Sequence, residues 1–193
     1  MAVKQRREES EAGFTLIELL FVVSIITFVS SFLVIYTIQA RVRARDVRRL
    51  TDKNQIIKAL HLAETDTGGD FPSSGFMDLG EGIQLGEWSC FGVPASEQCW
   101  RNSFSGYDTL ASIIKPQFRG SIPRPAALPG SFAYNSYLYI SDHPGWSDGK
   151  GDHPPGTYLI WPKEEEIKSS ECNPNFIYRH DENYWYCYEW LGE

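Results

Sequence analysis

The sequence has no glycine or proline between Phe14 and Thr67, and no charged residue between Leu19 and Ala40. Because glycine and proline are the usual helix breakers, this 54-residue stretch can form one continuous helix of about 80 Å. Its uncharged part is 22 residues long. As a helix that part measures about 33 Å, which matches the roughly 30 Å hydrocarbon core of a bilayer. The chain is therefore predicted to enter a membrane.

The sequence also lacks the motifs of catalytic sites. None of the four histidines accompanies a serine or cysteine in a nucleophile motif, and no glycine-rich phosphate loop occurs. The formal net charge of −7 disfavours nucleic acid as a partner. We expect a protein that is not an enzyme and needs no cofactor.

The order of charges before the apolar run excludes an ordinary secretory signal peptide. Such a signal places small residues for cleavage after its apolar stretch. Here basic and acidic residues come first, the small pair Ala12-Gly13 follows, and the apolar run begins only then. Cleavage at this pair would leave the hydrophobic segment on the mature protein, as an anchor or a packing element.

The junction Gly13-Phe14-Thr15-Leu16-Ile17-Glu18-Leu19-Leu20 resembles the class III signal of type IV pilins and of the pseudopilins of type II secretion. The resemblance implies that a prepilin peptidase cuts after Gly13 and methylates the new N-terminus, Phe14. It also implies three further partners: other pilin subunits, an inner-membrane assembly platform, and membrane lipids before assembly. The resulting division is a leader at 1–13, a membrane or filament-core helix at 14–40, an amphipathic continuation at 41–67 and a head at 68–193.

Glu18 is an acidic residue close to the start of a membrane helix, where a charge is costly. Its side chain could reach back to the lipid headgroups. In the family that the motif resembles, the glutamate instead pairs with the methylated amine of a neighbouring subunit, here that of Phe14. The second alternative makes Glu18 an assembly residue.

The second half of the helix is expected to be amphipathic. Its apolar residues are mostly three and four positions apart, and Gly68-Gly69 with Pro72 ends it. These apolar residues are Val42, Val47, Leu50, Ile56, Ile57, Leu60 and Leu62. A basic cluster shares the segment: Arg41, Arg43, Arg45, Arg48, Arg49 and Lys53. Its alternatives are a solvated helix face or contacts with neighbouring subunits, phospholipid headgroups or DNA.

The remaining residues predict a head domain of α+β class. Alternating apolar residues indicate strands around Phe132 to Tyr139, at Thr157 to Trp161, at Phe176 to Arg179 and at Tyr184 to Trp190. We expect three or four antiparallel strands packed against the helix, the architecture that the pilin resemblance also implies. Between them, 142–156 reads as a polar surface loop. Residues 70–127 are expected to be irregular, with one short helix from Tyr107 to Lys115 capped by Asp108.

Four cysteines in a domain predicted to lie outside the cytoplasm indicate disulfides. Three pairings are open. Local loop closure favours Cys90 with Cys99 and Cys172 with Cys187, and the second pair resembles the C-terminal disulfide loop of many pilins. A zinc site is the alternative, but the spacing is not Cys-x-x-Cys and no histidine stands at a ligand offset.

The loop with Asp142, Asp148 and Asp152 raises a calcium hypothesis, because oxygen-rich loops of exported proteins often bind this ion. Major pseudopilins of type II secretion carry a calcium site in a comparable loop. The spacing matches no compact ligand pattern, and the glycines and prolines also fit simple turns.

Two functions follow. One is a structural subunit of a type IV pilus or pseudopilus. The other is a minor pilin or membrane-anchored surface module that does not form the bulk filament and whose head serves in adhesion or binds DNA or a protein. In both, the chain crosses the bacterial inner membrane once, with its N-terminus cytoplasmic and its head outside, before reaching a surface pilus or a periplasmic pseudopilus. One position departs from the family pattern: Ile35 stands where pilins commonly have a helix-breaking proline.

Overall fold

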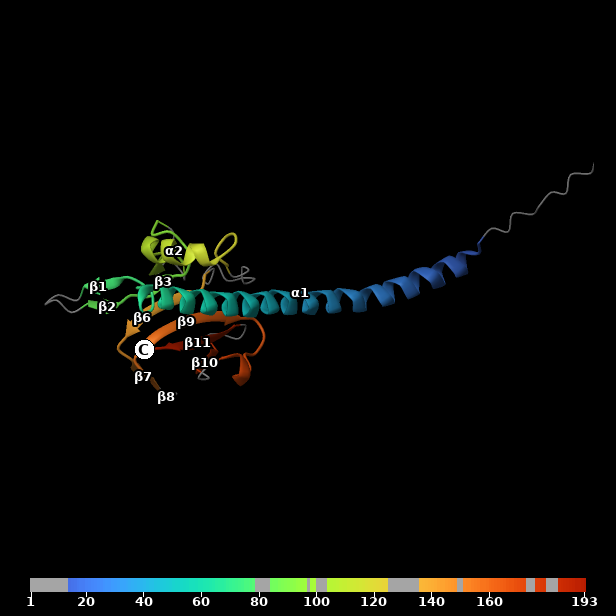
Figure 1. Cartoon of the computed structure of the whole chain (residues 1–193). Coiled ribbons are helices and arrows are strands. Elements are labelled where there is room, and N and C mark those ends of the chain that lie inside the picture. The colour runs from blue at the N-terminus through green and yellow to red at the C-terminus, as the bar shows by residue number, and fades with distance from the viewer. Residues whose placement is uncertain are drawn as a thin grey trace, which may run out of the picture. The chain divides into compact units, whose positions relative to one another are not determined.

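The computed structural model describes residues 14–78, 84–96, 98–99, 104–124, 136–148, 151–172, 176–179 and 184–193. The chain divides into two compact units, Met1–Arg41 and Val42–Glu193. Figure 1 shows the chain and labels most of its helices and strands. The helices are α1 (Leu16–Thr67), α2 (Asp108–Ile114) and the 3-10 helices η1 (Lys115–Gln117) and η2 (Ser169–Glu171). The strands are β1 (Phe76–Asp78), β2 (Gln84–Gly86), β3 (Ser89–Cys90), β4 (Gln98–Cys99), β5 (Phe104–Ser105), β6 (Leu138–His143), β7 (Trp146–Asp148), β8 (Gly151–His153), β9 (Gly156–Lys163), β10 (Phe176–Arg179) and β11 (Trp185–Gly192).

Helix α1 is continuous over its 52 residues, including Ile35. It ends where the two glycines predict. Gly68 has a φ of 97°, a left-handed conformation that glycine adopts without a Cβ penalty. The N–H of Gly69 then donates to the carbonyl of Glu64 at 2.9 Å. This is the 6→1 hydrogen bond of the Schellman motif that ends many helices.

The head contains a five-stranded antiparallel sheet in the order β10-β11-β9-β6-β3. This is one strand more than the largest number expected, because the two-residue β3 pairs with β6 at the edge. The part of α1 that belongs to this unit lies along the sheet (Figure 1). Ile56 and Leu60 of α1, both fully buried, pack with Tyr139, Leu159 and Trp161 of the sheet.

The helix face that packs on the sheet agrees with the predicted one only in part. Its buried positions follow spacings of three and four, but the first three of them are charged. They are Asp46, Arg49, Lys53, Ile56, Ala59, Leu60 and Ala63. Val47 and Leu62, expected on the apolar face, are 64% and 54% exposed. The apolar spacing therefore identified the helix and the apolar part of its buried stripe, which includes Ile56 and Leu60, but not the charged part.

Three local predictions were wrong. Residues 70–127 are not irregular apart from one helix, because their described part also contains the short strands β1 to β5. The side chain of Asp108 does not cap α2, whose N-cap residue is Tyr107 without a side-chain bond. Instead, the Asp108 carboxylate accepts the backbone N–H of Ala95 at 2.9 Å. The segment 142–156 is not a plain loop either, because its described residues form the β7–β8 hairpin. Phe132 and Tyr134, expected in a strand, lie outside the described residues.

Candidate functional site

The start of α1 forms a reciprocal cap between Thr15 and Glu18. The backbone N–H of Glu18 donates to Thr15 Oγ1 at 3.3 Å, and the backbone N–H of Thr15 donates to Glu18 Oε2 at 3.0 Å. The Thr15 hydroxyl also donates to this carboxylate oxygen at 2.8 Å. This is a capping box, which satisfies two backbone donors at a helix start. The spacing Thr-x-x-Glu could have predicted it from the sequence.

Phe14 precedes this cap and is 87% exposed. Gly13, on the other side of the expected cut, lies outside the described residues. The cap also gives the carboxylate of Glu18 a partner inside its own chain.

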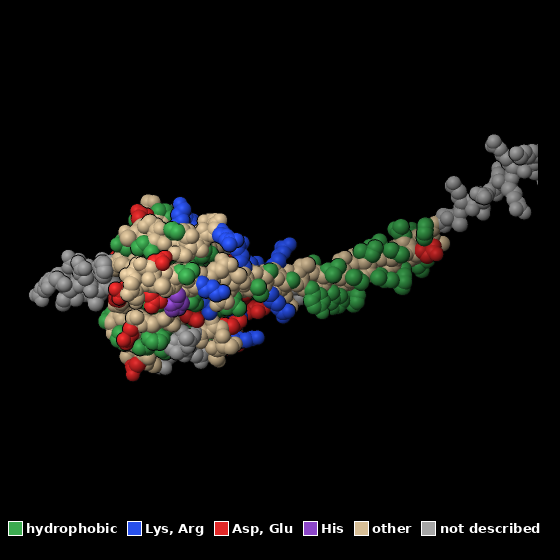
Figure 2. All heavy atoms as spheres, in the orientation of Figure 1, with side chains coloured by type: hydrophobic (Ala, Val, Ile, Leu, Met, Phe, Trp, Pro, Cys, Tyr) green, Lys and Arg blue, Asp and Glu red, His purple; other side chains and the backbone are tan. Residues whose placement is uncertain are grey.

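The first half of α1 presents its apolar side chains to the surroundings. Its large hydrophobic residues from Phe14 to Ile38 are 47% to 87% exposed wherever the side chain is described, and Figure 2 shows them as an apolar surface on the helix. Ser24 and Ser31 do not leave hydroxyls unpaired, because they donate to the carbonyls of Phe21 and Phe28 at 2.7 and 2.6 Å. Within the described part of the chain, α1 is the one helix long and apolar enough to cross a membrane.

The basic cluster of α1 is divided between internal and exposed roles. Arg45 and Arg49 both bind the carboxylate of Glu164, which follows β9, at 2.6 to 2.8 Å. Asp46 accepts the backbone N–H groups of Glu164 and Glu165 at 3.0 and 2.9 Å. These five residues, the helix–head clamp, fix α1 to the chain after β9. The solvated helix face considered from the sequence is therefore wrong for Arg49, which is fully buried.

Lys53 extends the internal half of the cluster. Its ammonium group donates to the Glu171 carbonyl at 3.2 Å and to Glu189 Oε1 at 3.3 Å. It also lies 5.3 Å from the ring centroid of Trp161, a cation–π contact. Arg48 remains outside this network with a 68% exposed side chain.

The pKa of Glu164 reflects the balance of forces in the clamp. Burial would raise this pKa, but the hydrogen bonds from Arg45 and Arg49 outweigh burial and leave it lowered. The same bonds raise the pKa of Arg45. Glu164 is therefore a carboxylate, and Arg45 a cation, throughout the neutral range.

Two disulfides hold other parts of the head. The structure pairs Cys90 with Cys99 and Cys172 with Cys187, the two local pairings. Among the described residues, one group could bring three metal-ligand atoms together, namely Cys172, Cys187 and Glu189. Its cysteines form a disulfide and so have no thiolate to offer a zinc ion.

The calcium hypothesis finds no assembled ligand set in the described residues. In the β7–β8 ladder, Asp148 lies opposite Gly151, whereas Asp152 lies opposite Ser147. Adjacent ladder pairs face opposite sides of a hairpin, so Asp148 and Asp152 belong to different faces. Asp142 is exposed in a left-handed conformation, with a φ of 53°, near the end of β6.

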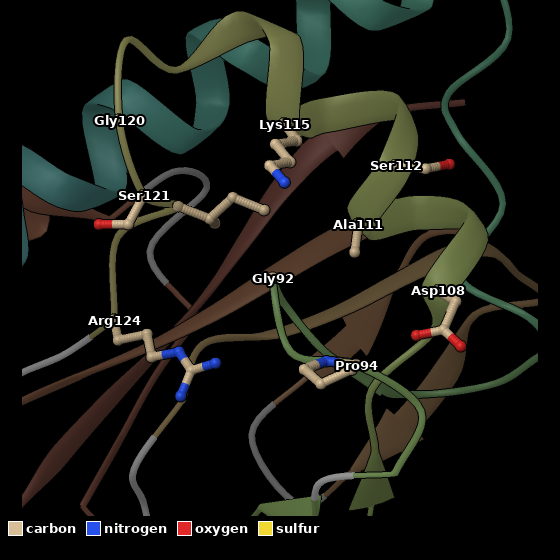
Figure 3. A pocket seen from close by; sticks show the side chains of 10 residues that line it. Gly92, Pro94, Asp108, Ala111, Ser112, Lys115, Gly120, Ser121 and Arg124 are labelled. Atoms are coloured by element: carbon tan, nitrogen blue, oxygen red, sulfur yellow. The ribbon is translucent and has the colours of Figure 1, made fainter.

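Two hollows of about 420 Å³ lie on the head. The first is beside α2 and is bordered by Asp108, Lys115 and Arg124 (Figure 3). It mixes charges of both signs, and Asp108 is already bonded to Ala95. The second, the aromatic hollow, is lined by Trp88, Phe104, Leu138, His143, Trp146, Ile160 and Tyr188.

Comparison with protein families matches residues 10–34 to the prokaryotic N-terminal methylation motif. No curated protein sequence and no solved structure shows significant similarity to the chain. The motif implies a structural protein, processing by a prepilin peptidase, and assembly with other pilin subunits. Together with the apolar helix it indicates a membrane anchor in a bacterium. The chain thus carries the N-terminal methylation motif that is the hallmark of type IV pilins and pseudopilins, which supports a pilin-like precursor.

Proposed function

We propose that this protein is a structural subunit of a type IV pilus or pseudopilus. A prepilin peptidase cuts it after Gly13 and methylates Phe14, and it polymerises through the first half of α1. The observation that carries this proposal is the exposed apolar surface of that half, most of which lies within the matched methylation motif, 10–34. Such a surface is stable in lipid and can be buried again among the same helices of other subunits.

In the proposed cycle, the chain waits in the inner membrane with its N-terminus in the cytoplasm and its head outside. The assembly platform then moves it from lipid into the filament. The carboxylate of Glu18 exchanges its local cap for the methylated amine of Phe14 on a neighbouring subunit. Because the two opposite charges neutralise each other, the docking of one subunit against the next becomes favourable in an apolar setting.

The test separates the charge of Glu18 from its capping role. Glu18→Gln keeps an oxygen that can cap the helix but loses the charge, whereas Thr15→Val keeps the charge but loses the reciprocal cap. We expect both variants to be cut after Gly13, as mass spectrometry of the N-terminus would show. Glu18→Gln should yield few filaments, and Thr15→Val should assemble nearly normally. Normal filament yield from Glu18→Gln would contradict the proposed pairing.

A second candidate is a minor subunit or an anchored binding module, which the aromatic hollow of the head favours. The two candidates differ in abundance. Mass spectrometry of sheared surface filaments would find a major subunit as the dominant protein and a minor one at a small fraction of it.

A further inference from the structure

The aromatic hollow lies on the sheet face opposite α1. Cys90, Leu138, Ile160 and Tyr188 are paired in one row across β3, β6, β9 and β11, so all four side chains share this face. Leu138 and Ile160, 2% and 3% exposed, make an aliphatic floor. The side chains around the floor are aromatic and only partly buried. The hollow is therefore an apolar site with aromatic walls.

Ring contacts fix the orientation of these walls. Trp146 stacks on His153 at a centroid distance of 3.9 Å and an angle of 5°, and His153 is itself 3% exposed. Trp88 meets Tyr188 at 6.3 Å and 89°, edge to face. The turn before Trp146 is also constrained, because Gly145 has a φ of 83° and an added Cβ would lie 2.8 Å from the His153 carbonyl. The walls are therefore held in place before any ligand arrives.

The polar side-chain groups of the lining are the ring nitrogens of Trp88, His143 and Trp146 and the hydroxyl of Tyr188. The backbone N–H of Gly145 donates to His143 Nδ1 at 3.0 Å, so the neutral ring carries its proton on Nε2. Burial, and then the neighbouring His153, lower the pKa of His143 and favour this neutral form. In the described part of the chain, His143 Nε2 and the indole N–H groups of Trp88 and Trp146 have no protein hydrogen-bond partner.

The charge of the lining restricts its ligand. Among the residues that the structure describes, no lysine or arginine lines the hollow to hold an anion, and no aspartate or glutamate lines it to bind an ammonium group. What remains is a neutral molecule with an apolar face for the aromatic rings and oxygen atoms that accept N–H bonds. A pyranose ring has both, since its axial C–H groups form an apolar face and its hydroxyls accept hydrogen bonds. A volume of about 420 Å³ is in the range of small-ligand pockets.

We propose that the aromatic hollow is a carbohydrate-binding site for a neutral sugar ring, which stacks on Trp88 or Trp146 and accepts hydrogen bonds from their indoles and from His143. This goes beyond the proposed assembly function and does not depend on it. The disulfide Cys90–Cys99 gains a role here. It joins β3, which follows Trp88, to β4, which pairs with the strand that carries Phe104, and so holds two walls together.

The experiment uses the full-length protein in a detergent without a sugar headgroup. Neutral hexoses and N-acetylhexosamines are titrated and followed by tryptophan fluorescence and by saturation-transfer NMR. We expect at least one sugar to bind saturably in the millimolar range. Trp146→Leu and Trp88→Leu should each weaken it about tenfold, the effect of one lost aromatic contact. Trp190→Leu is the matched control, because Trp190 is outside the lining and bonds to Pro155.

A second pair of variants distinguishes binding from folding. His143→Gln keeps an N–H donor near the position of Nε2 and should retain more affinity than His143→Leu, with equal unfolding midpoints for both. Three results would overturn the proposal: no saturable binding of any neutral sugar, equal losses in Trp190→Leu and Trp146→Leu, or tighter binding of charged sugars. Loss of filaments in Trp146→Leu without sugar binding by the parent would make the hollow a subunit contact instead.

Discussion

Arg49 lies fully buried with its guanidinium 2.8 Å from the carboxylate of Glu164, a residue 115 positions further along the chain. The same guanidinium is 2.5 Å from Asp46 on its own helix. Two carboxylates therefore share one buried cation, and that of Glu164 is also bound by Arg45. Because a buried charge without a partner is costly, this arrangement ties the folding of the head to its contact with α1.

Replacing Arg49 by methionine should destabilise the protein by about 3–5 kcal/mol, because Asp46 and Glu164 lose a shared counter-charge. Arg48→Met is the matched control on the same helix. Its side chain is 68% exposed and 3.8 Å from Asp52, so its loss should cost no more than about 1 kcal/mol. Denaturant unfolding of the full-length protein, followed by tryptophan fluorescence, measures both. Equal losses would mean that the helix–head clamp contributes little.

The stability of the head should fall in acid. Burial raises the pKa of Glu164 and of Glu171, but hydrogen bonds from the arginines and from Lys163 outweigh it and leave both lowered. A carboxyl group whose pKa is lower in the folded protein than in the unfolded chain stabilises the fold at every pH above its unfolded-state pKa. This stabilisation is lost as the pH falls through the folded-state pKa. Since an unperturbed glutamate titrates near about 4.3, the unfolding midpoint should drop below about pH 4.

Asp52 acts with the opposite sign, because burial raises its pKa, so its protonation partly offsets the loss. A Glu164→Gln variant provides the control for the acid effect. It should be less stable at neutral pH and show a shallower decline in acid. An unchanged acid profile in that variant would remove Glu164 as the cause.

Mapping of unreduced peptides should find Cys90 linked to Cys99 and Cys172 linked to Cys187. The second bridge closes a separation of 15 residues and should contribute about 3 kcal/mol in the chain-entropy model. Its double serine variant should therefore unfold at lower denaturant concentration. A Cys90–Cys187 peptide would contradict the pairing in the structure.

Chelation should leave the unfolding midpoint of the protein unchanged. Calcium needs several oxygen ligands at one point, whereas Asp148 and Asp152 belong to opposite faces of the β7–β8 hairpin. A midpoint that falls with chelator and recovers with added calcium would restore the calcium hypothesis.

The sequence predicted the elements better than their packing. The limits of α1 and its end at Gly68 follow from local rules, because breakers and caps act within a few residues. Local rules do not predict which charged residues of the helix are buried. Asp46 and Arg49 are buried because they bind Glu164, which is distant in sequence. The same limit applies to the aromatic hollow, where Trp88 and Trp146 meet Tyr188 through strand pairing. By contrast, Thr15 and Glu18 lie three positions apart, and their cap was within reach of the sequence alone.

The order of side chains along α1 has a mechanical consequence. Tension on the chain before Val42 would reach Arg45, Asp46 and Arg49 before it reached Ile56 and Leu60. The contacts of the first three are short, directional bonds to 164–165, and several of them must break together. The apolar contacts behind them are shielded until that happens. A force that pulls on the helix would therefore act first on the hydrogen bonds and ion pairs of the helix–head clamp, and only afterwards on the apolar core.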